Sequence, residues 1–150
     1  MSRTAAAAFF VMCGACSSSR AVELDVVMAS GNCQQTHEGV ARVTLSDVAK
    51  LRGTQLLGGE STDREAGPSP FLIVVAIGEK PTAGYGLAYD GAKLDGRTLI
   101  VTVRETAPPP DAMTAQVITH PCLVLEIPEG ELDRVRVVDA AGTVIGELTR

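Results

Sequence analysis

Short runs of apolar, β-branched residues recur through the second half of the chain and restrict the folds open to it. Residues 98–104 (TLIVTVR) place Leu99, Val101 and Val103 on one face, which is the two-residue period of a half-buried strand. Residues 71–77 (FLIVVAI) are apolar throughout and predict a strand that is buried on both faces. Because such runs recur without strand–helix–strand alternation, the pattern predicts an all-β sandwich or partly open barrel of about 7–9 short strands.

The other predicted strands are shorter and less regular. They lie at residues 22–29, 40–45, 84–89, 122–127, 134–138 and 143–148. Asp90-Gly91 and Asp95-Gly96 each predict a turn, and residues 139–142 predict the turn of a terminal hairpin.

One short helix is expected near residues 46–52, with Ser46 or Asp47 as its N-cap. The chain has 150 residues, which is enough for one domain with a sizeable core. We therefore expect residues 22–150 to form a single β domain.

Charge and composition exclude one class of partner. There are 13 Lys and Arg against 18 Asp and Glu, a net charge of −5 at pH 7, which disfavours nucleic acid and anionic membrane surfaces as electrostatic partners. Aromatic residues make up 3% of the chain and Trp is absent, so the chain lacks the stacking platforms that nucleic-acid binders use.

The N-terminus predicts export. Arg3 precedes eight apolar residues, 5–12 (AAAAFFVM), a run that has the length of a signal-peptide core and is too short to span a bilayer. The following CGACSSS resembles a bacterial lipobox, in which the last cysteine, here Cys16, becomes the acylated first residue of the mature chain. Cys13 occupies the position where leucine is usual.

We therefore expect a signal peptide over residues 1–15 and a lipid-anchored tether over residues 16–21. The mature protein would be a lipoprotein of the cell envelope that faces the periplasm or is anchored to the outer membrane, since two acyl chains suffice for stable anchoring. Cleavage as an ordinary secretory signal near Ala15 or Ser18 is the alternative, and it also implies export.

Export changes what the cysteines predict. Once Cys16 is acylated, Cys33 and Cys122 remain as an even pair in an oxidising compartment. A disulfide between them would close a loop of about 90 residues, and two separately buried thiols are the alternative. The mature chain has no Cys-x-x-Cys motif, so nothing predicts a zinc site.

The sequence carries no recognisable catalytic motif. The histidines are His37 and His120, and neither lies in a hydrolase or metalloprotease signature. His120 precedes Pro121 at a strand entrance, where a structural histidine is expected. Acidic residues at 126–133 fit a solvated turn and lack calcium-loop spacing. We expect a protein that is not an enzyme and has no metal site and no cofactor.

One connection is distinctive in sequence. Residues 78–85 (GEKPTAGY) join two predicted strands through a Pro and a Gly that restrict the turn. The segment is either a rigid hairpin connection or a preorganised recognition loop, because rigid turns lose less entropy on binding. The candidate partner-binding residues are Lys80, Pro81, Thr82, Ala83, Gly84 and Tyr85.

Three segments together resemble the C-terminal domain of the PrcB family, accessory lipoproteins of a bacterial surface protease complex. The segments are residues 71–85, 99–112 and 117–128, within a PrcB-like core at about 71–138. The resemblance implies a non-enzymatic β domain on an exported lipoprotein. The chain departs from the family at Cys122, where an aromatic residue often stands, and at Ala83, which replaces a second glycine.

A weaker similarity concerns the loop alone. Residues 81–85 (PTAGY) are similar to a loop that chagasin-like inhibitors insert into cysteine proteases, but the other two loops of those inhibitors have no counterpart here. We therefore expect an accessory or binding module of an envelope protein complex that contacts a protein partner, a protease being one candidate, through the 80–85 loop. It would reach the membrane only through its lipid. The alternative function is a chagasin-like protease inhibitor.

Overall fold

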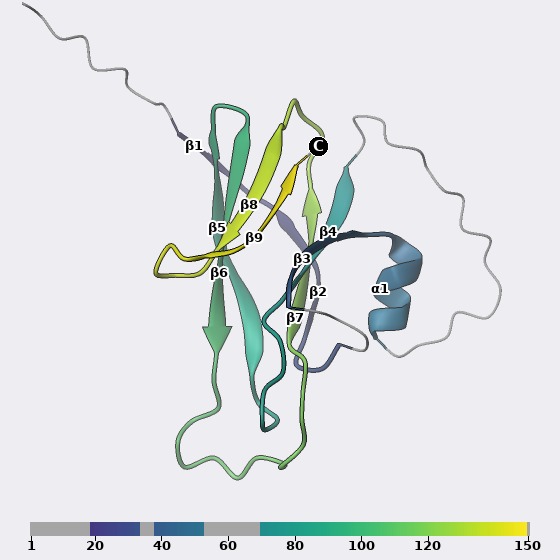
Figure 1. The fold of residues 1–150 in the computed structure, drawn as a ribbon, viewed down its shortest axis with the longest axis vertical. Coiled ribbons are helices and arrows are strands. Elements are labelled where there is room, and N and C mark those ends of the chain that lie inside the picture. Colours follow the sequence, from purple (N-terminus) through teal and green to yellow (C-terminus); the bar gives the residue numbers. More distant parts are fainter. Residues whose placement is uncertain (1–18, 34–37, 53–69, 150) are drawn as a thin grey trace, which may run out of the picture.

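A computed structural model describes residues 19–33, 38–52 and 70–149. These residues form nine strands and one helix, and the strands build two sheets that face each other (Figure 1). Of the two predicted all-β architectures, a sandwich or a partly open barrel, the structure confirms the sandwich. The predictions for residues 1–15, Cys16 and His37 fall outside the described residues.

The first sheet has five strands in the order β1-β5-β6-β8-β9. Their bounds are Arg20–Val22 for β1, Gly86–Asp95 for β5, Thr98–Thr106 for β6, Arg134–Val138 for β8 and Val144–Thr149 for β9. Neighbours pair antiparallel except β6 and β8, which run parallel. The parallel pair arises because β7 lies between β6 and β8 in sequence but belongs to the other sheet.

The second sheet has four antiparallel strands in the order β2-β7-β4-β3. Their bounds are Asp25–Ser30 for β2, Gly39–Val43 for β3, Phe71–Ala76 for β4 and Cys122–Ile127 for β7. The central strand β4 is buried from Leu72 to Ala76, which confirms the prediction of a strand covered on both faces.

Two apolar clusters, one on each face of β4, explain why this strand is buried on both faces. Ile73 and Val75 face the five-stranded sheet in the main core, which also holds Leu99, Val101 and Val103 of β6. The alternation in β6 therefore fits the burial that the sequence predicted. Burial of apolar surface is the main stabilising contribution in such a sandwich.

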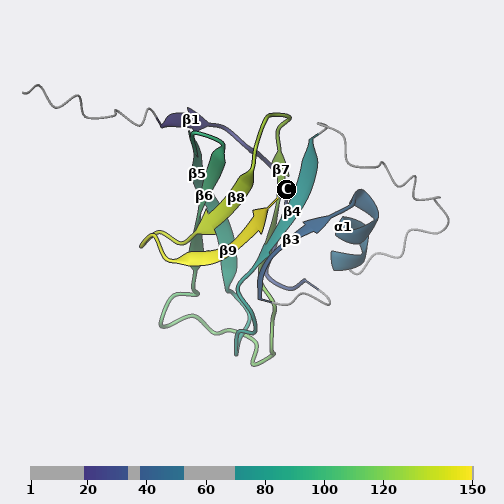
Figure 2. The same cartoon turned by 45° about the horizontal axis from the view of Figure 1, so that its top comes forward.

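The opposite face of β4 packs under the helix α1, Leu45–Leu51 (Figure 2). Val48 and Leu51 of the helix share a second cluster with Leu72 and Val74 of the strand. The helix lies on the side of the four-stranded sheet that faces away from the other sheet.

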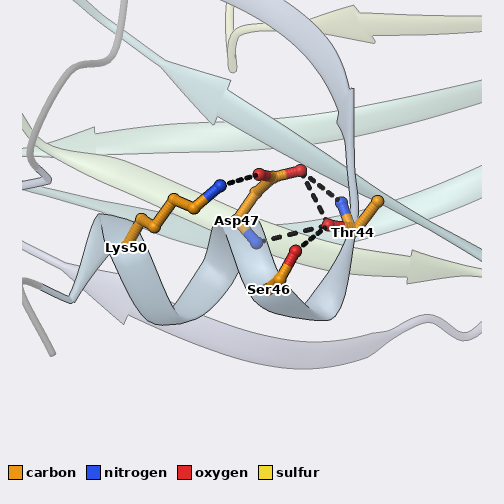
Figure 3. A network of polar contacts seen from close by, with 4 residues as sticks. All are labelled: Thr44, Ser46, Asp47 and Lys50. Atoms are coloured by element: carbon orange, nitrogen blue, oxygen red, sulfur yellow. Dashed lines mark hydrogen bonds and ion pairs between the residues drawn. The ribbon is translucent and has the colours of Figure 1, made fainter. Parts of the chain in front are cut away.

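A capping box starts α1 at Thr44, two residues before Ser46, the earlier of the two predicted N-caps. The Thr44 hydroxyl accepts a hydrogen bond from the Asp47 backbone N–H, and the Asp47 carboxylate accepts one from the Thr44 N–H at 3.0 Å (Figure 3). The predicted N-cap, Ser46 or Asp47, is therefore wrong: Asp47 is the third helical residue, and Ser46 lies in the first turn. Thr44 was missed because it also continues the strand alternation of residues 40–45.

Two further predictions need correction. Residues 22–29 were expected to form one strand, but the chain crosses between the sheets there and forms β1 and β2. Asp90-Gly91 was expected to be a turn, but β5 continues through it with a bulge between Tyr89 and Gly91. Gly91 supplies the positive φ of 144° that the bulge uses.

The remaining hairpin and disulfide predictions are confirmed. Asp95 pairs with Thr98 across a tight turn, and β8 and β9 form the terminal hairpin around residues 139–143. Cys33 and Cys122 form a disulfide with their Cα atoms 6.0 Å apart. β1 begins at Arg20, so the sheet includes the last two residues of the predicted tether.

Candidate functional site

Two long connections meet at one end of the sandwich. The β4–β5 connection, residues 77–85, and the β6–β7 connection, residues 107–121, project together below the sheets in Figure 1. They are joined by an antiparallel bridge in which the Lys80 N–H donates to the Thr119 carbonyl at 2.8 Å and the Thr119 N–H donates back at 2.9 Å. We name residues 78–85 and 107–120 the two-loop platform.

Two more hydrogen bonds fasten the platform. The Ala83 N–H donates to the Ala115 carbonyl at 3.0 Å, and the Thr119 hydroxyl donates to the Thr82 carbonyl at 3.0 Å. Thr119 is the buried polar residue of the described chain, at 6% exposure. The distinctive loop therefore shares its backbone hydrogen bonds with the neighbouring connection, and the two hold one shape.

Gly84 allows the two connections to touch. Its φ is +96°, which an L side chain rarely adopts, and a Cβ there would lie 2.9 Å from the Cβ of Pro108. Glycine in this motif is thus required both by its own backbone and by the proline that packs against it.

Lys80 lies across the base of the loop. Its Nζ forms an ion pair with Glu105 Oε1 of β6 at 2.8 Å and sits 5.6 Å from the centroid of the Tyr85 ring. The side chain is 20% exposed. Lys80 and Tyr85 are therefore engaged within the domain, and their charge and ring support the loop.

A third segment supports the platform from behind. The His120 carbonyl accepts a hydrogen bond from the Cys33 N–H at 2.7 Å, and the His120 N–H donates to Asn32 Oδ1 at 3.3 Å. The Cys33–Cys122 disulfide lies directly beside these bonds and is buried. His120 thus connects the platform to the N-terminal part of the domain, and its Nε2 lies 3.5 Å from Glu79 Oε1.

The outer surface of the platform carries exposed apolar side chains on the β6–β7 connection, where the sequence predicted no site. Met113 is fully exposed, Ile118 is 63% exposed and Val117 is 52% exposed, all on the β6–β7 connection. In the 80–85 loop, Pro81 and Gly84 are the exposed residues. The sequence did not predict these three exposed side chains; the adjacent apolar residues Val117 and Ile118, which do not alternate with polar ones, were the available signal.

The other predicted site residues lie in or next to the platform. Residues 80–85 belong to the first of the two connections of the platform. Cys122 follows the second connection, and Cys33 is hydrogen-bonded to its residue His120. Within the described ranges, no group of His, Cys, Asp or Glu is arranged to hold a metal ion. In the same ranges, no helix is long and apolar enough to cross a bilayer.

Comparison with known proteins identifies one family. The family model described as PrcB C-terminal matches residues 71–128, which run from β4 to the end of β7 and include both connections of the platform. The resemblance predicted from the sequence is confirmed over these residues. No curated protein matches the chain, and no solved structure matches it.

Proposed function

Residues 71–128 are a PrcB C-terminal domain, and from this premise we propose that the chain is a non-enzymatic binding subunit of an envelope protein complex. The two-loop platform is its contact surface for a protein partner. The family resemblance makes a protease, or a protein associated with one, the first candidate for that partner.

The observation that carries the proposal is the exposed apolar surface on a loop pair of fixed shape. Met113, Val117 and Ile118 are exposed on a connection that four main-chain-directed hydrogen bonds hold against the 80–85 loop. A surface that is already ordered loses little entropy on binding, and exposed apolar side chains are what protein interfaces bury.

The subunit would be attached to the membrane by a lipid on Cys16. The support is the apolar run at residues 5–12 followed by a cysteine after small residues. A diacylated cysteine anchors a protein without a membrane-spanning segment. Mass spectrometry of the mature N-terminus tests this part of the proposal directly.

The test of the proposed function compares two triple variants of the lipidated protein. The platform variant is Met113→Gln, Val117→Thr, Ile118→Thr. The control variant changes three exposed apolar residues elsewhere, Val26→Thr, Leu45→Gln and Val144→Thr. Proteins captured from crosslinked envelopes are then identified by mass spectrometry. We expect a partner that the wild type and the control capture and the platform variant loses; equal capture by all three contradicts the proposal.

Tyr85→Ala tests whether the 80–85 loop takes part in partner binding. Because the Tyr85 ring contacts the Lys80 ammonium group, this variant changes both the surface and the packing of the loop. Loss of partner capture at an unchanged melting temperature indicates recognition, whereas a joint loss indicates that the ring holds the loop in shape.

Steady-state assays with papain-like proteases separate a binding subunit from an inhibitor of the chagasin type. The proposal predicts no stoichiometric inhibition, because only one of the three inhibitory loops has a counterpart in the sequence. Inhibition at nanomolar concentration that is lost in the platform variant would replace the accessory function with the inhibitory one.

A further inference from the structure

We infer that the domain stands upright on the membrane, with the β5–β6 hairpin next to the bilayer and the two-loop platform at the far end. The inference rests on the lipid anchor of the proposed function. It specifies the partner further: the partner presents its contact surface well above the membrane and is not a protein that lies within the bilayer plane.

The point where the chain enters the fold determines the near end. β1 starts at Arg20, which pairs with Leu94, and Val22 pairs with Ala92. These partners lie at the end of β5 that leads into the hairpin turn at Gly96 and Arg97. From Cys16 to Arg20 the chain can span at most about 14 Å, so a lipid on Cys16 holds the hairpin end close to the bilayer.

The length of β5 separates the two ends. This strand runs for 10 residues from Gly86, beside the platform, to Asp95 in the hairpin. A strand rises about 3.4 Å per residue, so its ends lie roughly 30 Å apart. Figures 1 and 2 both show the β5–β6 hairpin and the platform at opposite ends of the sandwich.

The charges at the near end nearly balance, because the exposed Arg20, Lys93 and Arg97 offset the exposed Asp95, Glu131 and Asp133. The β7–β8 connection lies there, since the Asp133 N–H donates to the Arg97 carbonyl at 2.9 Å. Glu131 and Asp133 on that connection are 88% and 64% exposed, and both pair with Arg97, whose charge they more than neutralise. A surface without an excess of positive charge gains little from anionic headgroups, so the lipid is the attachment that holds this end at the bilayer.

The test measures the heights of three labelled positions above a bilayer. Mature, lipidated protein is placed in vesicles of phosphatidylethanolamine and phosphatidylglycerol that carry an acceptor-labelled lipid. Donor dyes are attached to Lys93→Cys near the hairpin, Ala140→Cys at the β8–β9 turn, or Met113→Cys on the platform; all three positions are exposed. Energy transfer to the acceptor plane reports each height, and wild type carried through the same labelling reaction corrects for background labelling.

We expect transfer to fall in the order Lys93, Ala140, Met113, with more than about 20 Å between the first and last heights. Equal heights or the reverse order would overturn the inference. A mature chain without a lipid on Cys16 would overturn it as well.

The height measurement and the partner-capture experiment can fail independently of each other. If the heights follow the expected order but the platform variant captures the partner as well as the wild type does, the orientation stands and the binding surface is wrong. If the platform variant loses the partner but the heights are equal, the binding surface stands and the orientation is wrong.

Discussion

At the scale of single residues, the contact between Gly84 and Pro108 sets the shape of the platform. The two residues belong to different connections, and the distance from a Cβ at position 84 to Pro108 Cβ would be 2.9 Å. A proline ring cannot move aside as the end of a flexible side chain can. Any side chain at position 84 must therefore push the two connections apart.

Gly84→Ala is expected to destabilise the domain by about 2–5 kcal/mol, the sum of left-handed strain and overpacking. Gly142→Ala is the matched control, because Gly142 also has a positive φ of 87° but a Cβ there meets nothing within 4 Å; its expected cost is about 1–2 kcal/mol. Urea unfolding measures both. Equal losses would mean that the connections separate without cost.

At the scale of elements, the helix α1 covers the outer face of β4 and is started by the Thr44–Asp47 capping box. Hydrogen bonds from the backbone N–H and the hydroxyl of Thr44 lower the pKa of Asp47 below its ordinary value of 3.8. A carboxylate with a lowered pKa stabilises the folded state above the unfolded pKa, and that contribution is lost as the pH falls through the folded pKa.

Thr44→Ala is expected to cost about 1 kcal/mol of unfolding free energy, the usual cost of losing an N-cap. Asp47→Asn is expected to lower stability at pH 7 and to have no effect below the lowered pKa, where the wild-type carboxyl is protonated too. Urea unfolding of wild type and both variants from pH 7 to pH 3 measures this. A gap between wild type and Asp47→Asn that does not narrow as the pH falls below 3.8 would contradict the assigned role of the carboxylate.

The elements that the sequence predicts well are those whose pattern depends on local burial. Alternation at residues 98–104 and the uniform run at 71–77 follow directly from one buried face and from two. The Asp90-Gly91 bulge was not predictable, because the same dipeptide forms hairpin turns. Its outcome depends on β1 and β6, which pair with the continuing part of β5 from distant parts of the sequence.

At the scale of the whole molecule, the disulfide ties the N-terminal part of the domain to the family segment. Cys122 lies within residues 71–128 and Cys33 precedes them, with a sequence separation of 89. The bond therefore restricts the unfolded chain over most of its length. It also holds the segment that supports His120 and, through it, the platform.

Reduction of this disulfide is expected to lower the stability of the wild type by about 4 kcal/mol, as the loop-closure account gives for a loop of this length. The double variant Cys33→Ala/Cys122→Ala is expected to be less stable than the wild type without reductant. Its stability should not change when reductant is added. Urea midpoints with and without dithiothreitol provide the comparison. A wild-type midpoint that does not move under complete reduction would contradict this role.

The candidate site was predictable in part. The 80–85 loop and its glycine were visible in the sequence because Pro and Gly mark rigid turns. Met113, Val117 and Ile118 were not predicted as surface residues, because the path of their connection depends on distant contacts such as the hydrogen bonds of Thr119 to Lys80 and Thr82. Those bonds join residues that are 37 and 39 positions apart, and nothing in the local pattern of residues 113–118 predicts them.

Photo-crosslinking in living cells tests the central claim most directly. A photoreactive amino acid replaces Met113 or Pro81 on the platform, or Leu45 or Val144 away from it; all four positions are exposed. We expect one protein partner to be crosslinked from both platform positions and from neither control position. The same crosslinks from all four positions, or crosslinks from the control positions alone, would contradict the platform as the contact surface.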